Sequence, residues 1–308
     1  VHIRGSHRST HDYASIHEGP INRGEAIQHH SYLKWPSTIM DEQLYSSVLK
    51  FMLRDHVEDA KRLNRTLSKS NDAGLVHEMP PIPFTGDLEL MERGNCVCLL
   101  GINPLWPASG KMAHELELKP AMRLIQRLRD GDHTAFGQYL ATRLNYFSSE
   151  IANWGHFDKV GSGYSEHFFE GVDKRTVWKN HAFAMDVVPY FSRDATSLDR
   201  KRIVEQVSTD PSLNHHQDIL ASIIAETQPL ILHLNGSHAI QVVENLYCER
   251  PLERQGALGS QFGLRFGEAI INGTAIKVFA HNQFGYGRYN PSKKHWPEFA
   301  KAWKNWRI

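Results

Sequence analysis

The sequence predicts an α/β protein with a parallel sheet, and three observations support this. Four short apolar runs rich in β-branched residues lie far apart in the chain, at residues 96–100, 182–188, 230–234 and 275–280. Each run is too apolar for the alternation of a half-buried strand, as expected for parallel strands that are buried on both faces. Segments with helical periodicity separate the runs, and this alternation is typical of a parallel sheet with crossover helices.

The remaining elements follow in chain order. Residues 1–36 are polar, rich in histidine and without a period, so we expect an irregular arm before a single domain over residues 37–308. From residue 41 to about residue 70 the apolar positions repeat with helical spacing, and Asp41 is a suitable N-cap. Further helical patterns cover 121–129, 137–151, 199–206, 218–226 and 239–246, and the apolar positions of a last helix predict core packing by Phe299, Trp303 and Trp306.

One segment shows no period. Residues 152–178 are rich in glycine and aromatic residues, and we expect an irregular insertion there. Long irregular insertions in compact domains often have a functional role, although a surface flap is an equal alternative.

Composition and charge exclude several classes. With 41% hydrophobic residues, 22% charged residues and a net charge of +1, the chain is an ordinary globular protein in which any nucleic-acid surface must be local. No apolar stretch reaches the ~18 residues of a membrane helix, no signal peptide opens the sequence, and three cysteines make a poor disulfide framework. We therefore expect a cytoplasmic protein that does not associate with a membrane.

Sequence patterns for metals and phosphates are missing. HExxH, CxxC and GxxxxGK motifs do not occur, and the adjacent pairs His29/His30 and His215/His216 cannot share one helix face. We expect no metal and no cofactor. A metal-dependent hydrolase stays a minor alternative because of the 19 histidines.

The segments that follow the four predicted strands carry polar and aromatic residues together with glycine or proline. They are GINPLWPASG at 101–110, MDVVPYFSR at 185–193, NGSHA at 235–239 and HNQFGYGRYNPSKK at 281–294. Ligands of open α/β sheets bind at the carboxyl ends of the strands. The four segments are therefore expected to surround one cleft.

The strand followed by GINP at 101–104, the Pro-rich approach at 80–100 and the strand followed by a histidine at 280–288 resemble the motifs of the uracil-DNA glycosylase superfamily. The resemblance covers about residues 75–295 in order and spacing. It implies a three-layer α/β/α fold with a central four-stranded parallel sheet. The sequence departs from the usual motifs at Leu105 and Trp106, and where Asn282 and Gln283 follow His281.

The resemblance implies hydrolysis of an N-glycosidic bond, which passes through an oxocarbenium-like sugar and a negatively charged leaving base. Asn103 would orient the attacking water, and His281 would donate a hydrogen bond to the leaving base. The alternatives are a turn residue before proline for Asn103 and an ordinary surface histidine for His281.

Asp186 lies where the uracil enzymes of this superfamily have an asparagine that contacts the pyrimidine edge. An ionised carboxylate only accepts hydrogen bonds, so it matches the amino group of cytosine better than the O4 of uracil. An enzyme that removed plain cytosine would destroy its host genome. Relatives that remove glucosylated hydroxymethylcytosine from phage DNA make this base our preferred substrate. A structural alternative is that Asp186 caps the next turn.

The target base would be flipped out of duplex DNA. The predicted base pocket adds four residues: Trp106, Tyr190, Phe191 and Asn235. The predicted DNA contacts are Gly236, Ser237, Asn282, Gln283, Tyr286 and Arg288, where the first two precede a helix N-terminus. In the insertion, a sugar-binding wall is expected from Trp154, His156, Tyr164, His167 and Phe168. Each aromatic residue has core packing as its alternative.

Two alternative functions remain. A uracil or damaged-base repair glycosylase would use the same residues on another base. A catalytically inactive DNA-binding module on the same fold would tolerate Asn103→Ala without loss. Double-stranded DNA is the expected partner, and no obligate protein partner is evident.

Overall fold

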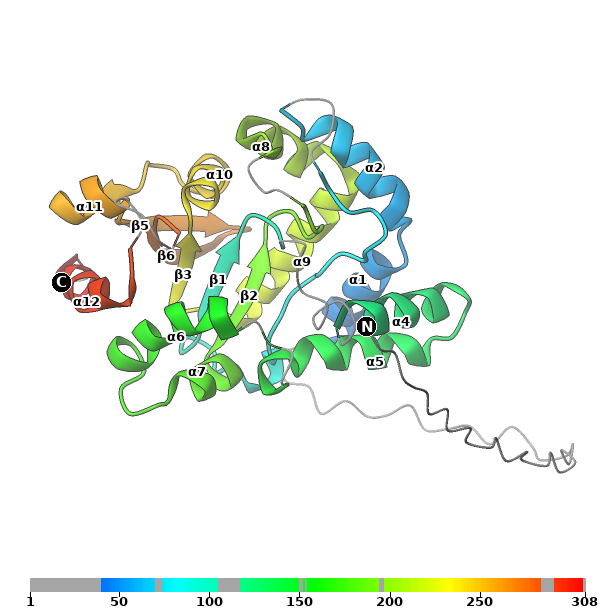
Figure 1. Cartoon of the computed structure of the whole chain (residues 1–308), viewed down its shortest axis with the longest axis horizontal. Coiled ribbons are helices and arrows are strands. Elements are labelled where there is room, and N and C mark those ends of the chain that lie inside the picture. The colour runs from blue at the N-terminus through cyan, green and yellow to red at the C-terminus, as the bar shows by residue number, and fades with distance from the viewer. Residues whose placement is uncertain are drawn as a thin grey trace, which may run out of the picture. The chain divides into compact units, whose positions relative to one another are not determined.

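The computed structural model describes residues 40–69, 74–104, 117–149, 152, 154–193, 197–283 and 291–306, with only the backbone at residues 154 and 156 (Figure 1). Ser37–Ile308 forms one compact unit. The predicted N-terminal arm at residues 1–36 lies outside the described residues.

The centre of this unit is a mixed sheet with the strand order β2-β1-β3-β6-β5-β4. The strands are β1 (Val97–Gly101), β2 (Ala182–Asp186), β3 (Ile231–Asn235), β4 (Glu253–Arg254), β5 (Arg265–Ile271) and β6 (Thr274–His281). The four predicted runs form β1, β2, β3 and β6, which pair in parallel. β5 and β4 extend the sheet in antiparallel pairing. The four predicted strands are thus parallel as expected, but the prediction of a four-stranded, purely parallel sheet is wrong because two further strands make the sheet six-stranded and mixed.

The sequence does not predict β5, because its buried and exposed residues alternate and it therefore lacks the apolar run of its parallel neighbours. Asn272 and Gly273 join it to β6 with φ angles of 48° and 81°. Two consecutive left-handed residues form the tight hairpin turn for which Asn-Gly is the strongest sequence signal. The turn was therefore present in the sequence as a hairpin signal.

Helices cover both faces of the sheet. They are α1 (Glu42–Met52), α2 (His56–Thr66), α4 (Lys119–Arg129), α5 (Thr134–Leu144), α6 (Trp154–His167), α7 (Lys174–Asn180), α8 (Arg200–Thr209), α9 (Pro211–Thr227), α10 (Ser237–Tyr247), α11 (Gly256–Phe262) and α12 (Trp296–Trp306). In β1, Cys98 and Leu100 belong to a core with α1, α4, α5, α8, α9 and α10, whereas Val97 and Leu99 belong to a core with α6, α7 and α12. Successive strand residues point to opposite faces, which explains the two cores.

The predicted helix over residues 41–70 is divided into α1 and α2. Asp41 caps α1 as predicted, because its carboxylate accepts from the Leu44 N–H at 2.7 Å. Asp55 caps α2 in the same way through the Glu58 N–H. A second N-cap in the middle of the pattern therefore restarts the helix.

The expectation of an irregular insertion at 152–178 is wrong, since this segment contains α6 and the start of α7. The helical period is not visible in the sequence because α6 has glycines at positions of its buried face, where an apolar side chain would otherwise mark the period. Side chains from elsewhere in the chain pack closely against these glycines. A Cβ at Gly163 would lie 2.0 Å from ring atoms of Trp296, and one at Gly161 would lie 2.5 Å from Trp178 Nε1. The glycines of α6 thus let two tryptophans pack against the helix.

Candidate active site

The strand register brings the predicted site residues to one edge of the sheet. Asp186 pairs with Gly101 across β2 and β1, and Asn235 pairs with His281 across β3 and β6. Leu100 pairs with Leu234, so Gly101 and Asn235 also lie level with one another. Residues that pair across parallel strands point to the same face of the sheet. Gly101, Asp186, Asn235 and His281 therefore form a row at the carboxyl ends of the strands, on the face that α6, α7 and α12 cover.

Gly101 makes room for the carboxylate of Asp186. A Cβ at Gly101 would lie only 2.2 Å from Asp186 Oδ1, so any larger residue would displace this group. Asp186 as a residue is half-buried, and its carboxylate makes no hydrogen bond or ion pair with the residues that the structure describes. Burial raises the pKa of Asp186 to about 7. At neutral pH this carboxyl group is thus present in both protonation states.

The side-chain amide of Asn103 has a fixed orientation. Its Nδ2 lies 2.6 Å from Ser192 Oγ, 3.1 Å from the Pro104 carbonyl oxygen and 3.4 Å from the Tyr190 carbonyl oxygen. A rotated amide would place Oδ1 against these two carbonyl oxygens, which cannot donate. Asn103 Oδ1 is shielded from solvent and receives no donor from the described part of the chain. It is an acceptor without a partner among the described residues.

Ser192 is held rigidly beside Asn103. Its side chain is buried, its N–H donates to the Pro104 carbonyl at 3.0 Å, and its backbone forms a bridge with Leu75. Ser192 is not among the residues that the sequence predicts for the site. No local pattern marks a buried serine that follows a strand by several residues.

His281 belongs to a buried chain of hydrogen bonds. Its Nδ1 lies 2.6 Å from the carbonyl oxygen of Asn282, and its Nε2 lies 2.8 Å from His233 Nε2. A carbonyl oxygen only accepts, so His281 carries its proton on Nδ1 and accepts from His233. His233 Nδ1 then accepts from the hydroxyl of Tyr164. Burial lowers the pKa of His281 to about 4, so the ring is neutral at pH 7.

This chain gives His281 a different environment from the one predicted. The side chain is fully buried, and its only N–H points to the Asn282 carbonyl. Donation to a leaving base would require the ring to turn. Tyr164 is also buried, and Phe168 packs edge-on against Phe279 and Trp296, so both contribute to the core. The sequence does hold a signal for His233, a polar residue two positions before Asn235 in an apolar strand.

Two aromatic residues of the predicted pocket pack inside the protein. Tyr190 is fully buried with its hydroxyl 3.4 Å from Asp59 Oδ2, and Phe191 packs with Val76 and Met79. Their positions favour the core alternative over stacking on a base. Trp106, Tyr286 and Arg288 lie outside the described residues.

The predicted DNA contacts that the structure describes lie around the end of β3 and β6. Gly236 has a φ of 123° and donates its N–H to the His281 carbonyl at 2.9 Å. Ser237, the first residue of α10, is exposed, as is Gln283. Asn282 donates its N–H to the Phe262 carbonyl at 2.8 Å. This arrangement joins the start of α10 to the segment that follows β6.

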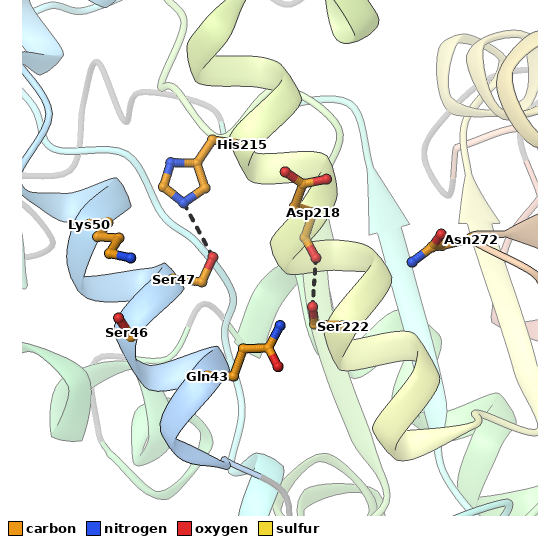
Figure 2. Close-up of a pocket in the computed structure, with 8 residues that line it drawn as sticks. All are labelled: Gln43, Ser46, Ser47, Lys50, His215, Asp218, Ser222 and Asn272. Carbon is orange, nitrogen blue, oxygen red and sulfur yellow. Dashed lines mark hydrogen bonds between the residues drawn. The ribbon is translucent and has the colours of Figure 1, made fainter.

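A separate polar hollow of about 500 Å³ lies between α1 and α9 (Figure 2). Its lining residues are Gln43, Ser46, Ser47, Lys50, His215, Asp218, Ser222 and Asn272. Ser47 Oγ lies 3.2 Å from His215 Nε2, but a catalytic serine–histidine pair also needs a group that orients the imidazole. Figure 2 shows the Asp218 carboxylate apart from the His215 ring, and only the Asp218 backbone carbonyl is bonded, to Ser222. The row at the carboxyl ends is the better candidate.

Within the described ranges, no group of histidine, cysteine, aspartate and glutamate side chains is arranged to hold a metal ion. No helix in this part of the chain is long and apolar enough to cross a membrane. No protein-family model matches the chain, and a comparison with curated proteins finds no match.

Proposed function

We propose that this protein is a monofunctional DNA glycosylase. It hydrolyses the N-glycosidic bond of a flipped, modified pyrimidine in duplex DNA and leaves an abasic site. Glucosylated hydroxymethylcytosine of phage DNA is the preferred substrate, which gives the enzyme a role in antiviral defence. The observation that carries the proposal is the carboxyl group of Asp186, which lies against Gly101 at the carboxyl ends of the strands without a partner among the described residues.

The Asn103 amide supports a water-orienting role. Its Oδ1 needs a donor, and a water molecule supplies one. The oriented water oxygen bonds to the anomeric carbon, the base leaves with the electron pair of the glycosidic bond, and the water proton passes to solvent. An amide orients the water without deprotonating it. The reaction therefore depends on a sugar that already has oxocarbenium character.

Asp186 supports recognition of the base edge. Its ionised form accepts a hydrogen bond from the amino group of cytosine. Its protonated form also donates, and can pair with O4 and N3–H of uracil. A pKa of about 7 gives both forms near neutral pH, which keeps a uracil repair glycosylase as a second candidate. If the bulky modification contributed contacts that are essential for binding, the enzyme would not act on normal cytosine.

The test uses purified full-length protein and four duplexes that carry cytosine, uracil, hydroxymethylcytosine or its glucosylated form. Alkali converts each abasic site into a strand break. We expect breaks in the glucosylated duplex alone, and their loss in Asn103→Ala. Asp186→Asn offers an amide in place of the carboxylate and should shift cleavage towards uracil.

The matched control is Asn95→Ala, which removes a side-chain amide that donates to Glu92 Oε2 and to no other group among the described residues. It should cleave like the unmodified protein. Breaks with uracil alone would assign the protein to repair and contradict recognition of cytosine by the ionised form of Asp186. DNA binding without breaks in any duplex would identify an inactive binding module.

A further inference from the structure

We infer that Lys69, Arg193, Arg200, Arg202 and His238 form a surface that binds the phosphate backbone of duplex DNA. We call these five residues the basic surface. The inference rests on the proposed function for its choice of ligand, and it adds residues that the sequence motifs did not indicate.

Backbone pairing brings the basic surface together from distant parts of the chain. Ser68 forms a bridge with Leu198, and Lys69 donates its N–H to the Ser197 carbonyl at 3.2 Å. A Cβ at Gly74 would lie 3.7 Å from Ser197 Oγ and 3.9 Å from Arg193 Cβ. Lys69 and Arg193 are thus placed beside the start of α8.

Neutral acceptors orient the two arginines of α8. Arg202 donates to the Ser68 carbonyl at 2.6 Å, and Arg200 donates to Gln241 Oε1 on α10. Arg200 Nη2 also lies 3.3 Å from His238 Nδ1. These acceptors are uncharged, so they occupy some N–H groups of the arginines and leave the positive charges in place. Guanidinium groups have further donors in a fixed plane, which suits phosphate oxygens.

The cationic groups are close enough to affect one another. Burial lowers the pKa of His238, and the charges of Arg200 and Lys69 lower it further. The carboxylate of Asp199 lies at the same helix end, where it accepts from the N–H groups of Lys201 and Arg202 as the N-cap of α8. Gathering like charges opposes folding, whereas a bound polyanion would relieve their repulsion.

The basic surface lies at the same edge of the sheet as the candidate active site. α8 follows β2 and α10 follows β3, and Figure 1 shows both helices beyond the carboxyl ends of these strands. His238 is three residues from Asn235, which lies level with Gly101. A duplex that delivers a base to Asp186 would therefore pass its phosphates over this surface. A net charge of +1 makes such a local concentration necessary.

The test measures the affinity of the full chain for an unmodified duplex by fluorescence anisotropy at several salt concentrations. The slope of log affinity against log salt falls by about 0.9 for each phosphate contact that is lost. We expect Arg200→Ala and Lys69→Ala each to reduce the slope by about one, equally for different DNA sequences. Arg200→Lys keeps the charge and should retain most of the slope.

Lys179→Ala is the control, because this exposed lysine lies just before β2, at the opposite edge of the sheet. An equal effect of Lys179→Ala, unchanged slopes in both basic-surface variants, or no DNA binding by the unmodified protein would overturn the inference. The strand-break assay separates the two proposals. If Arg200→Ala changes the slope but no duplex is cleaved, the proposed glycosylase activity is rejected and the basic surface is supported. If a duplex is cleaved but the slopes do not change, the glycosylase activity is supported and the basic surface is rejected.

Discussion

At the residue scale, the position of Asp186 is unfavourable for a charged carboxylate but suited to a functional role. Its carboxylate lies against Gly101, without an ion pair among the described residues. Structural carboxylates such as Asp59 and Asp210 differ, since hydrogen bonds from arginine outweigh the effect of their burial and lower their pKa. Perturbed carboxyl groups at the ends of strands are typical of functional sites.

Asp186→Asn should stabilise the protein at alkaline pH. The folded-state pKa of about 7 lies above the unfolded value of about 3.9, so between these pH values the folded chain binds more protons and its stability falls as pH rises. Removing the charge should raise the free energy of unfolding by on the order of 1 kcal/mol at pH 8 and change it little near pH 4. Urea unfolding at both pH values measures this. A variant less stable at pH 8 would mean that the carboxylate has a favourable partner.

Ser192→Ala should lower turnover through Asn103. The lost hydrogen bond is worth about 1 kcal/mol, so we expect a roughly three- to tenfold lower kcat with little change in KM. In the Asn103→Ala background the same substitution should have no further effect on turnover. Single-turnover kinetics of the unmodified protein, the two single variants and the double variant give this cycle.

Ser212→Ala is the matched control for Ser192→Ala. This serine is equally buried, and its hydroxyl donates to Asp210 Oδ1 at 2.7 Å, far along the chain from Asn103. It should lose stability and keep its turnover. Additive effects of Ser192→Ala and Asn103→Ala would show that Ser192 acts independently of the amide.

At the element scale, α6 and α12 depend on a glycine where they meet. Gly163 faces the buried Trp296 so closely that a methyl group would overlap its ring. The Trp296 Nε1–H also donates to the Lys159 carbonyl on α6 at 3.0 Å, which fixes the indole. The two helices therefore meet in one arrangement.

Gly163→Ala should destabilise the protein despite the better helix propensity of alanine. Overpacking against a fixed ring costs about 1–3 kcal/mol. Gly137→Ala in α5 is the matched control, because a Cβ there meets nothing within 4 Å. It should stabilise the protein by roughly 0.5–1 kcal/mol. Thermal unfolding of both variants tests the contrast, and a stabilising Gly163→Ala would contradict the described contact.

At the scale of the whole unit, an ion network ties α2 to α9 and to the segment after β2. Arg62 donates to Asp210 at 2.7 Å and to Asp59 at 2.7 Å, and Arg54 also donates to Asp59. The Tyr190 hydroxyl reaches the same Asp59 carboxylate. Both carboxylates are buried, so they depend on their arginine partners.

Arg62→Ala should destabilise the protein most at neutral pH. Both aspartates have lowered pKa values in the folded state, so their contribution is present above the unfolded pKa and is lost as pH falls through the folded value. We expect a loss of about 1–3 kcal/mol at pH 7, which shrinks towards pH 3. Lys61→Ala removes an exposed ion pair with Glu58 and should change stability by less than about 0.5 kcal/mol. Equal losses by Arg62→Ala at pH 7 and pH 3, measured by denaturant unfolding, would contradict this account.

The sequence by itself determined the parallel part of the sheet, the first N-cap and the C-terminal core. These features depend on local signals: the predominantly apolar strands β1, β2, β3 and β6, Asp41, and the spacing of Phe299 and Trp303. It also placed Asn103, Asp186, Asn235 and His281 at strand ends. Parallel strands that end together bring such residues to one edge.

Only the tertiary structure decided which groups each of these residues meets. Three contacts join segments that are far apart in the chain. His281 points inward to His233 and Tyr164, Ser192 accepts a hydrogen bond from Asn103, and Asp186 lies against Gly101. The helices at 152–178 depend likewise on glycines that fit Trp178 and Trp296. Periodicity reports which face of an element is buried, whereas these contacts depend on the shape of what packs against it.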